Sequence, residues 1–220
     1  MVPEETLEFV QRIDHDPLNL VAISHEDRVR FAQFDKEHWP DAVTWAREYN
    51  KKGWKLYYGV NVMHPLDKRV PSRGTGKDVA VLWGFPIDLD AKSPIRPTTE
   101  AERGPILATA LRIIAFFREN GLGRPMLVDS GNGYQVVSVL RPPVILDDAA
   151  RVIWNQRFTR LTRHLQEKFS SDEVKVDSMF DLPRVFALPG TLKNKRTKTD
   201  NYTGDRPNRV VRVLDWGDLS

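Results

Sequence analysis

The segment VAVLWGFPIDLD, at positions 79–90, constrains the fold more than any other part of the chain. It is almost continuously apolar, and an apolar run bounded by polar segments is typical of a strand buried within a sheet. The run ends at Asp88 and Asp90. We therefore expect a buried strand that emerges from the core at two carboxylates.

The remaining pattern predicts alternating helices and strands. Amphipathic spacing and capping signals predict helices near residues 4–12, 40–50, 99–120 and 147–169. Short apolar runs predict strands near residues 18–24, 54–62, 126–130, 134–140, 173–177 and 208–216. The sequence shows neither an internal repeat nor a flexible linker, so we predict one continuous α/β (α+β) domain over residues 1–220.

Composition excludes several classes of protein. The 220 residues are 40% hydrophobic, which suffices for a packed core. The absence of cysteine excludes disulfides, thiol nucleophiles and cysteine-ligated metals, and the five histidines lack metal-ligand spacing. No apolar run approaches the roughly 20 residues of a membrane helix, and the acidic start is unlike a signal peptide. We expect a cytoplasmic protein without a membrane partner, in which oxygen atoms would hold any metal.

Asp88 and Asp90 are two residues apart, so on a strand both side chains point to one face and Leu89 to the other. Two carboxylates on one face can share hard divalent cations, Mg²⁺ or Mn²⁺. Ordinary solvated acids at a strand end are the alternative. An Asp-X-Asp pattern also occurs in glycosyltransferases.

The segment SGNGYQ, at positions 130–135, lies between two expected strands. Gly131 and Gly133 permit positive φ and close approach, which would leave backbone N–H groups free to cradle phosphate oxygens. A plain hairpin turn explains the two glycines equally well. The earlier segment RGTGKD, at positions 73–78, lacks the spacing of a Walker phosphate loop, so we reject that class of ATPase.

A third carboxylate, Asp177, precedes a basic stretch. Residues 184–212 contain eight basic residues and two acids, whereas the whole chain has 33 basic and 30 acidic residues. A solvated surface is the simplest explanation of such a stretch. Following three carboxylates, however, the cations complete the parts of a two-metal nucleotidyl-transfer site, in which basic groups hold a polyphosphate.

The segments IDLD, SGNGYQ and VKVD, in that order, resemble motifs I, II and III of the archaeo-eukaryotic primase superfamily, especially the primase-polymerases of plasmids, phages and mobile elements. The segment DLPRVFALPGTLKNK resembles that group's arginine, PGT turn and lysine. Residues 206–209 resemble its closing basic strand. The resemblance spans about residues 57–213.

This resemblance implies a single primase-polymerase catalytic domain, with an N-terminal α/β unit (1–60) beside an RRM-like mixed sheet that carries most of the motifs (61–220). It implies catalytic and metal-binding roles for Asp88, Asp90 and Asp177. It implies nucleotide binding by Ser130, Gly131, Gly133, Gln135, Arg184 and Lys195. It implies nucleic-acid binding by Lys193, Arg196, Lys198, Arg206 and Arg209.

Two positions depart from the family pattern. Gln135 stands where motif II usually has a nucleotide-binding histidine, and Lys193 stands where many relatives have asparagine. A glutamine can donate only a neutral hydrogen bond to a phosphate, so its nucleotide contact would be weaker than that of a charged histidine. A structural hydrogen bond to a neighbouring strand is the alternative role of Gln135.

The resemblance implies a template-directed nucleotidyltransferase, a DNA primase or DNA polymerase or both, that uses NTPs or dNTPs with Mg²⁺ or Mn²⁺. Its expected partners are a single-stranded DNA template and a primer, with a helicase domain or helicase protein as a further candidate. One alternative is a catalytically weak replication-initiator or accessory domain that binds DNA and nucleotide. Another is a glycosyltransferase, which would leave SGNGYQ and the basic stretch unexplained.

Overall fold

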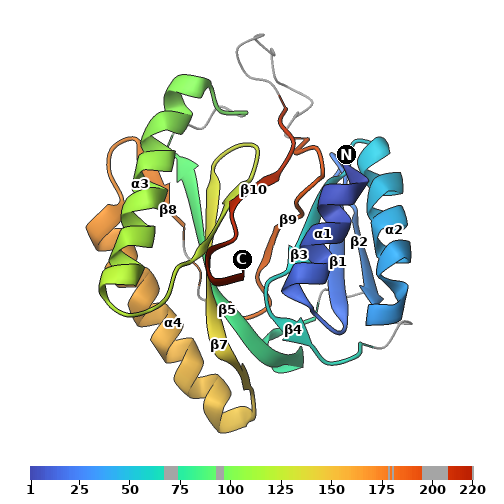
Figure 1. Cartoon of the computed structure of the whole chain (residues 1–220), viewed down its shortest axis with the longest axis horizontal. Coiled ribbons are helices and arrows are strands. Elements are labelled where there is room, and N and C mark those ends of the chain that lie inside the picture. The colour runs from blue at the N-terminus through green and yellow to red at the C-terminus, as the bar shows by residue number, and fades with distance from the viewer. Residues whose placement is uncertain (67–73, 93–96, 178, 180, 195–207, 220) are drawn as a thin grey trace.

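The computed structural model describes residues 1–66, 74–92, 97–177, 179, 181–194 and 208–219. Within these ranges the chain forms four α-helices and two antiparallel sheets (Figure 1). The helices are α1 (Pro3–Ile13), α2 (Trp39–Lys51), α3 (Glu100–Glu119) and α4 (Asp148–Phe169). The predicted α/β class is confirmed.

The first sheet has the strand order β2-β1-β3-β9. Its strands are β1 (Leu18–Ile23), β2 (Val29–Phe34), β3 (Lys55–Gly59) and β9 (Val185–Ala187). The sequence patterns predicted neither β2 nor β9. Because β9 pairs with β3, a segment from late in the chain completes the N-terminal sheet.

The second sheet has the order β10-β6-β7-β5-β4, and β8 also pairs with β5. Its strands are β4 (Val62–Met63), β5 (Val79–Ala91), β6 (Met126–Asp129), β7 (Tyr134–Ile145), β8 (Val174–Val176) and β10 (Arg212–Asp215). Every described pairing is antiparallel, so the sheet expected to be mixed is antiparallel here. The single strand expected over 54–62 is divided between the two sheets.

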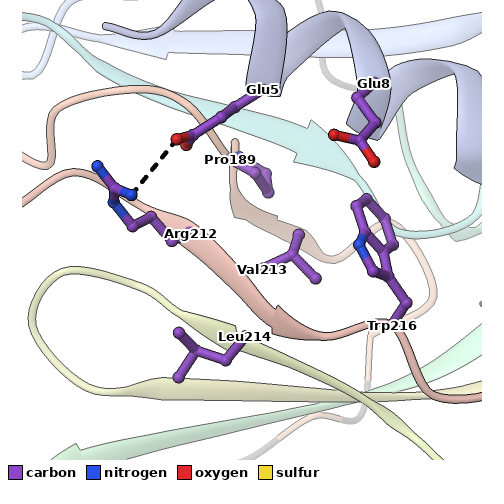
Figure 2. A pocket seen from close by; sticks show the side chains of 7 residues that line it. All are labelled: Glu5, Glu8, Pro189, Arg212, Val213, Leu214 and Trp216. Carbon is purple, nitrogen blue, oxygen red and sulfur yellow. Dashed lines mark ion pairs between the residues drawn. The ribbon is translucent and has the colours of Figure 1, made fainter.

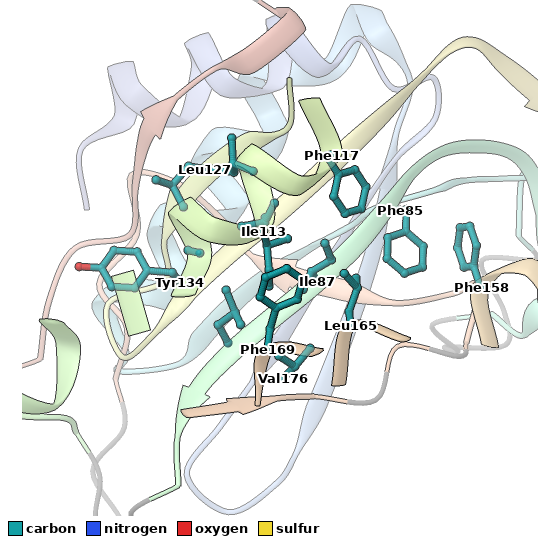
Figure 3. Packing of buried hydrophobic residues seen from close by; sticks show 14 of the residues in the cluster. Phe85, Ile87, Ile113, Phe117, Leu127, Tyr134, Phe158, Leu165, Phe169 and Val176 are labelled. Carbon is teal, nitrogen blue, oxygen red and sulfur yellow. The ribbon is translucent and has the colours of Figure 1, made fainter. Parts of the chain in front are cut away.

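The long strand β5 lies inside the second sheet, as its apolar sequence predicted. It pairs with β7 on one side, and with β4 and β8 on the other. Phe85, Ile87 and Leu89 belong to the core between this sheet and helices α3 and α4 (Figure 3). Asp88 and Asp90, on the opposite face, are half-buried.

Local signals place the two long helices. Thr99 caps α3 in a capping box with Glu102, and the helix stops before Gly121, whose φ is 70°. Asp147 caps α4 through the N–H of Ala150. Figure 1 shows α3 and α4 beside the six-stranded sheet, with α1 and α2 beside the four-stranded sheet at the other side of the molecule. Among the described residues we find no helix both long and apolar enough to cross a membrane.

A second core cluster joins the two sheets. It includes residues of α1, α2 and the four-stranded sheet together with Trp83, Met126, Val128 and Val137 of the six-stranded sheet. His15 is 1% exposed and packs edge-on against Trp83, with ring centroids 4.9 Å apart. Burial lowers the pKa of His15 from 6.5 to about 3, against the opposing effects of a Gly59 backbone hydrogen bond and the charge of Asp14.

The burial of His15 predicts loss of stability in acid. Below about pH 6.5 the unfolded chain binds a proton at this position, whereas the folded chain does not, so acid favours unfolding. From pH 7 to pH 5 this group should lower the free energy of unfolding by about 2 kcal/mol. Denaturant titrations of wild type and His15→Phe at both pH values test this. Between pH 7 and pH 5, the free energy of unfolding of His15→Phe should fall by about 2 kcal/mol less than that of wild type. The control His25→Phe, at an exposed site, should lose as much as wild type. Equal losses in His15→Phe and wild type would contradict the prediction.

Candidate metal and nucleotide site

Strand register places the three predicted acids on one face of the sheet. Leu89 pairs with Val176, and the backbone N–H of Asp177 donates to the carbonyl oxygen of Asp88 over 2.9 Å. Asp177 therefore lies opposite Asp88, on the same sheet face. Since the other face packs on α3 and α4, the acids lie on the side that faces β3 and β9.

A lysine that the sequence interpretation missed lies among these acids. Lys175 pairs with Asp90 across the strands, and its Nζ is 2.7 Å from Oδ1 of Asp177. The hydrogen bond and charge of Asp177 raise the pKa of Lys175, with smaller contributions from Asp90 and Asp88. The alternation in VKVD could have revealed Lys175, because it shares a face with Asp177.

Lys193 lies beside the acids from the other direction. Its side chain is 6% exposed, and its Nζ is 4.2 Å from the ring centroid of Tyr57 on β3. Burial lowers the pKa of Lys193 from 10.5 to about 8, although the charges of Asp88 and Asp90 oppose the shift. Lys193 is thus a buried cation near two carboxylates.

The backbone around Lys193 is held from two sides. Its N–H donates to the carbonyl oxygen of Arg209 over 2.9 Å. The preceding Leu192 exchanges two hydrogen bonds with the side chain of Asn50, both 2.9 Å long. Asn50, a buried residue near the end of α2, was not among the predicted site residues because nothing in the local sequence links it to Leu192.

The turn at residues 130–133 uses most of its own donors. Ser130 N–H donates to Gly133 O, Gly131 N–H to Asp129 Oδ1, and Gly133 N–H to Ser130 Oγ, over 3.1, 2.8 and 3.1 Å. The expectation of free N–H groups for phosphate is therefore wrong at these three positions, and the hairpin alternative describes them. The φ of Gly131 is 81°, which explains its glycine.

Gln135 connects the two sheets. It is 4% exposed, lies opposite Asp88 in the strand register, and accepts the N–H of Ala187 at Oε1 over 3.2 Å. Ala187 belongs to β9, so the structural alternative considered for Gln135 is present.

Removing the amide of Gln135 should destabilise the fold. In Gln135→Met the buried N–H of Ala187 loses its acceptor while side-chain volume is kept, and a buried unsatisfied donor costs about 1–3 kcal/mol. Urea unfolding measures the difference. The exposed Gln11→Met on α1 is the control and should change stability by less than about 0.5 kcal/mol. Equal stability of Gln135→Met and wild type would show that the contact contributes nothing.

The other predicted cations have different positions. Arg184 Nη2 lies 2.6 Å from Asp181 Oδ1, just before β9. Arg209 bonds Glu100 Oε1 over 2.6 Å and the Thr98 carbonyl over 2.9 Å, joining the C-terminal segment to the start of α3. Four predicted residues lie outside the described residues: Lys195, Arg196, Lys198 and Arg206.

A cavity of about 350 Å³ lies between α1 and β10 (Figure 2). Its lining includes Trp216, Val213 and an ion pair of 3.4 Å between Arg212 and Glu5. It contains none of the predicted site residues.

The donor chemistry of the acid site fits a hard divalent cation, because Asp88, Asp90 and Asp177 supply carboxylate oxygens on one face. Within the described ranges, no three acids or histidines are already gathered as a metal-holding group. The carboxylate of Asp177 contacts Lys175 instead. A cation bound at Asp177 would therefore share this carboxylate with Lys175 or displace the lysine.

The described residues form two antiparallel sheets with four α-helices, and this fold is similar to that of primase and polymerase catalytic domains. Among solved structures, the chain is similar to primase RepB', with 12% identity and a TM-score of 0.52 over 97% of this chain and 56% of that one. This chain thus spans about half the length of that primase. No protein-family model and no curated protein sequence matches the chain.

Two further similar structures contain DNA. The catalytic domain of primase RepB' in complex with initiator DNA has 12% identity and a TM-score of 0.50, over 96% of this chain and 85% of that one. The polymerase domain of Mycobacterium tuberculosis Ligase D in complex with DNA has the same identity and TM-score, over 95% and 79%. The likeness to these structures confirms that the chain has the fold expected from the resemblance, that of primase and polymerase catalytic domains.

Proposed function

We propose that this chain is a template-directed nucleotidyltransferase, a DNA primase or DNA polymerase, that joins nucleotides from NTPs or dNTPs using Mg²⁺ or Mn²⁺. One observation carries the proposal: Asp88, Asp90 and Asp177 share a sheet face beside the buried Lys193, in a fold similar to primase and polymerase domains. Carboxylates paired with a cation suit a polyphosphate substrate and its metal.

Different side chains would bind the metal and the nucleotide. Asp88, Asp90 and Asp177 would hold the divalent cation. When bound, the cation would neutralise triphosphate charge and align a primer 3′-OH for attack on the α-phosphate, with pyrophosphate leaving. Lys193, expected from the resemblance to bind nucleic acid, is proposed instead to hold triphosphate oxygens, since its ammonium is buried near the carboxylates rather than on an open surface.

The other residues predicted from the sequence have proposed roles in binding nucleotide and DNA. Arg184 and Lys195 are proposed to contact triphosphate, with Ser130, Gly131, Gly133 and Gln135 shaping the nucleotide side of the site. Arg196, Lys198 and Arg206 are proposed to contact DNA phosphates. Arg209, expected from the resemblance to bind nucleic acid, contacts Glu100 and Thr98. We propose that it supports the site through these contacts.

A single-stranded DNA template and a primer are the proposed partners, and a helicase domain or protein is a further one. Two structures of similar fold, a primase catalytic domain and a polymerase domain, were determined with DNA. The proposed activity therefore requires that this chain bind single-stranded or primed DNA.

One assay tests the proposal. The protein is incubated with a single-stranded template, Mn²⁺ and labelled NTPs or dNTPs, with and without a primer. We expect labelled products that Asp90→Ala does not make. Products without a primer would show priming, and products only with a primer would show extension alone. DNA binding without any product, in Mn²⁺ or Mg²⁺, would overturn the catalytic proposal and favour an accessory domain.

A further inference from the structure

Asn132, at the tip of the β6-β7 turn, contacts one of the three acids. It is 1% exposed, and its Nδ2 donates to Oδ1 of Asp90 over 3.3 Å. A neutral amide can orient a carboxylate by hydrogen bonding without adding a positive charge. Asn132 therefore differs from Lys175, which holds Asp177 with a charged group.

The orientation of the Asn132 amide is set by Thr98. The backbone N–H of Thr98 donates to Oδ1 of Asn132 over 3.0 Å, and Thr98 Oγ1 donates to the Asn132 carbonyl oxygen. Thr98 is completely buried. Because Oδ1 already accepts from a backbone donor, the Nδ2 donor is the atom that faces Asp90.

The turn that carries Asn132 is also fixed in place. A Cβ at Gly133 would lie 2.0 Å from the carbonyl oxygen of Leu89 and 2.8 Å from Oδ1 of Asp90, so only glycine allows this approach. On the other side, Asp129 accepts the Gly131 N–H and, through its second oxygen, Arg103 Nη2 over 2.6 Å. The turn is thus a rigid support directly beside Asp90.

We propose that Asn132 is a positioning residue that fixes the orientation of the Asp90 carboxylate for a divalent cation. This inference rests on the proposed function. It gives the SGNG turn a role in supporting the carboxylate, in place of the phosphate cradle expected from its glycines. Partners that orient metal-binding carboxylates typically affect metal affinity by 10–100-fold when removed.

Direct Mn²⁺ binding, followed by electron paramagnetic resonance of the free ion, tests the assignment without an activity assay. Asn132→Ala should raise the Kd for Mn²⁺ by about tenfold or more. Thr98→Val is the matched control, because it removes one buried hydrogen bond of the same turn but keeps the backbone N–H that orients the amide. Its Kd should stay within about twofold of wild type.

The outcomes separate this inference from the proposed function. Absence of Mn²⁺ binding by wild type, or unchanged binding by Asp90→Ala, would overturn the proposed function and the positioning role with it. If Asp90→Ala loses binding but Asn132→Ala binds as wild type, only the positioning role fails. Should Asn132→Ala not fold, Asn132→Ser, whose short hydroxyl cannot reach Asp90, replaces it and should show the same weakening. Failure of both to fold, with Thr98→Val folded, would make Asn132 merely structural and overturn the inference.

Discussion

Primer extension should be lost when either acid of β5 is replaced. In Asp88→Ala and Asp90→Ala we expect the rate to fall by at least about 1000-fold, since loss of a metal-binding carboxylate removes several kcal/mol of transition-state stabilisation. DNA binding should persist, because both acids repel rather than attract the phosphate backbone. Extension rates at one Mn²⁺ concentration and DNA affinities by fluorescence anisotropy measure the two effects.

The exposed acid Asp172, before β8, offers a control for loss of one negative charge. Asp172→Ala should extend primers at the wild-type rate. Extension by Asp90→Ala at the wild-type rate would exclude a metal role for this carboxylate. A parallel loss of DNA affinity would instead indicate that the substitution disturbs the fold around β5.

Lys193→Met should weaken nucleotide use and stabilise the protein. Without the ammonium, the nucleotide KM should rise by about tenfold or more, because a charge-assisted contact to phosphate is lost. The same ammonium is costly to bury, as its pKa of about 8 indicates. Methionine keeps the stem, so we expect the free energy of unfolding at pH 7 to increase by about 1–3 kcal/mol.

Lys193→Met is expected to weaken nucleotide binding while stabilising the fold. Simple damage to the fold would instead weaken binding and lower stability together. Nucleotide titrations at saturating primer give KM, and urea titrations without substrate give stability. Lys51→Met, an exposed substitution on α2, should change neither quantity. A Lys193→Met protein with wild-type KM would exclude Lys193 from the triphosphate contact.

The elements with strong local signals could be predicted from the sequence. The apolar run of β5, the Thr99 capping box and the alternation of Asp88, Leu89 and Asp90 each act within a few residues. Strand β9 could not be predicted in this way, since its three residues lie in a turn-rich segment and become a strand only by pairing with β3.

The site residues also differ in whether local sequence or tertiary contacts reveal them. The acids were found from their spacing and from the family resemblance, but their neighbours depend on tertiary contacts. In the sequence, Lys193 is one cation of a basic stretch. Its burial becomes evident only in the fold, where it packs against Tyr57. The contact of Asn132 with Asp90 likewise joins a turn to a strand about 40 residues away.

The pairing of β9 with β3 can form only late in protein synthesis, because β9 lies far along the chain from β3. The ribosome delivers β3 about 125 residues before β9, and at roughly 5–20 residues per second the interval is about 6–25 s. Throughout that time the N-terminal sheet has an open edge at β3, and such edges attract strands of other chains. A nascent or truncated chain that ends before residue 185 would therefore be exposed to misassembly until a partner strand, or a chaperone, covers β3.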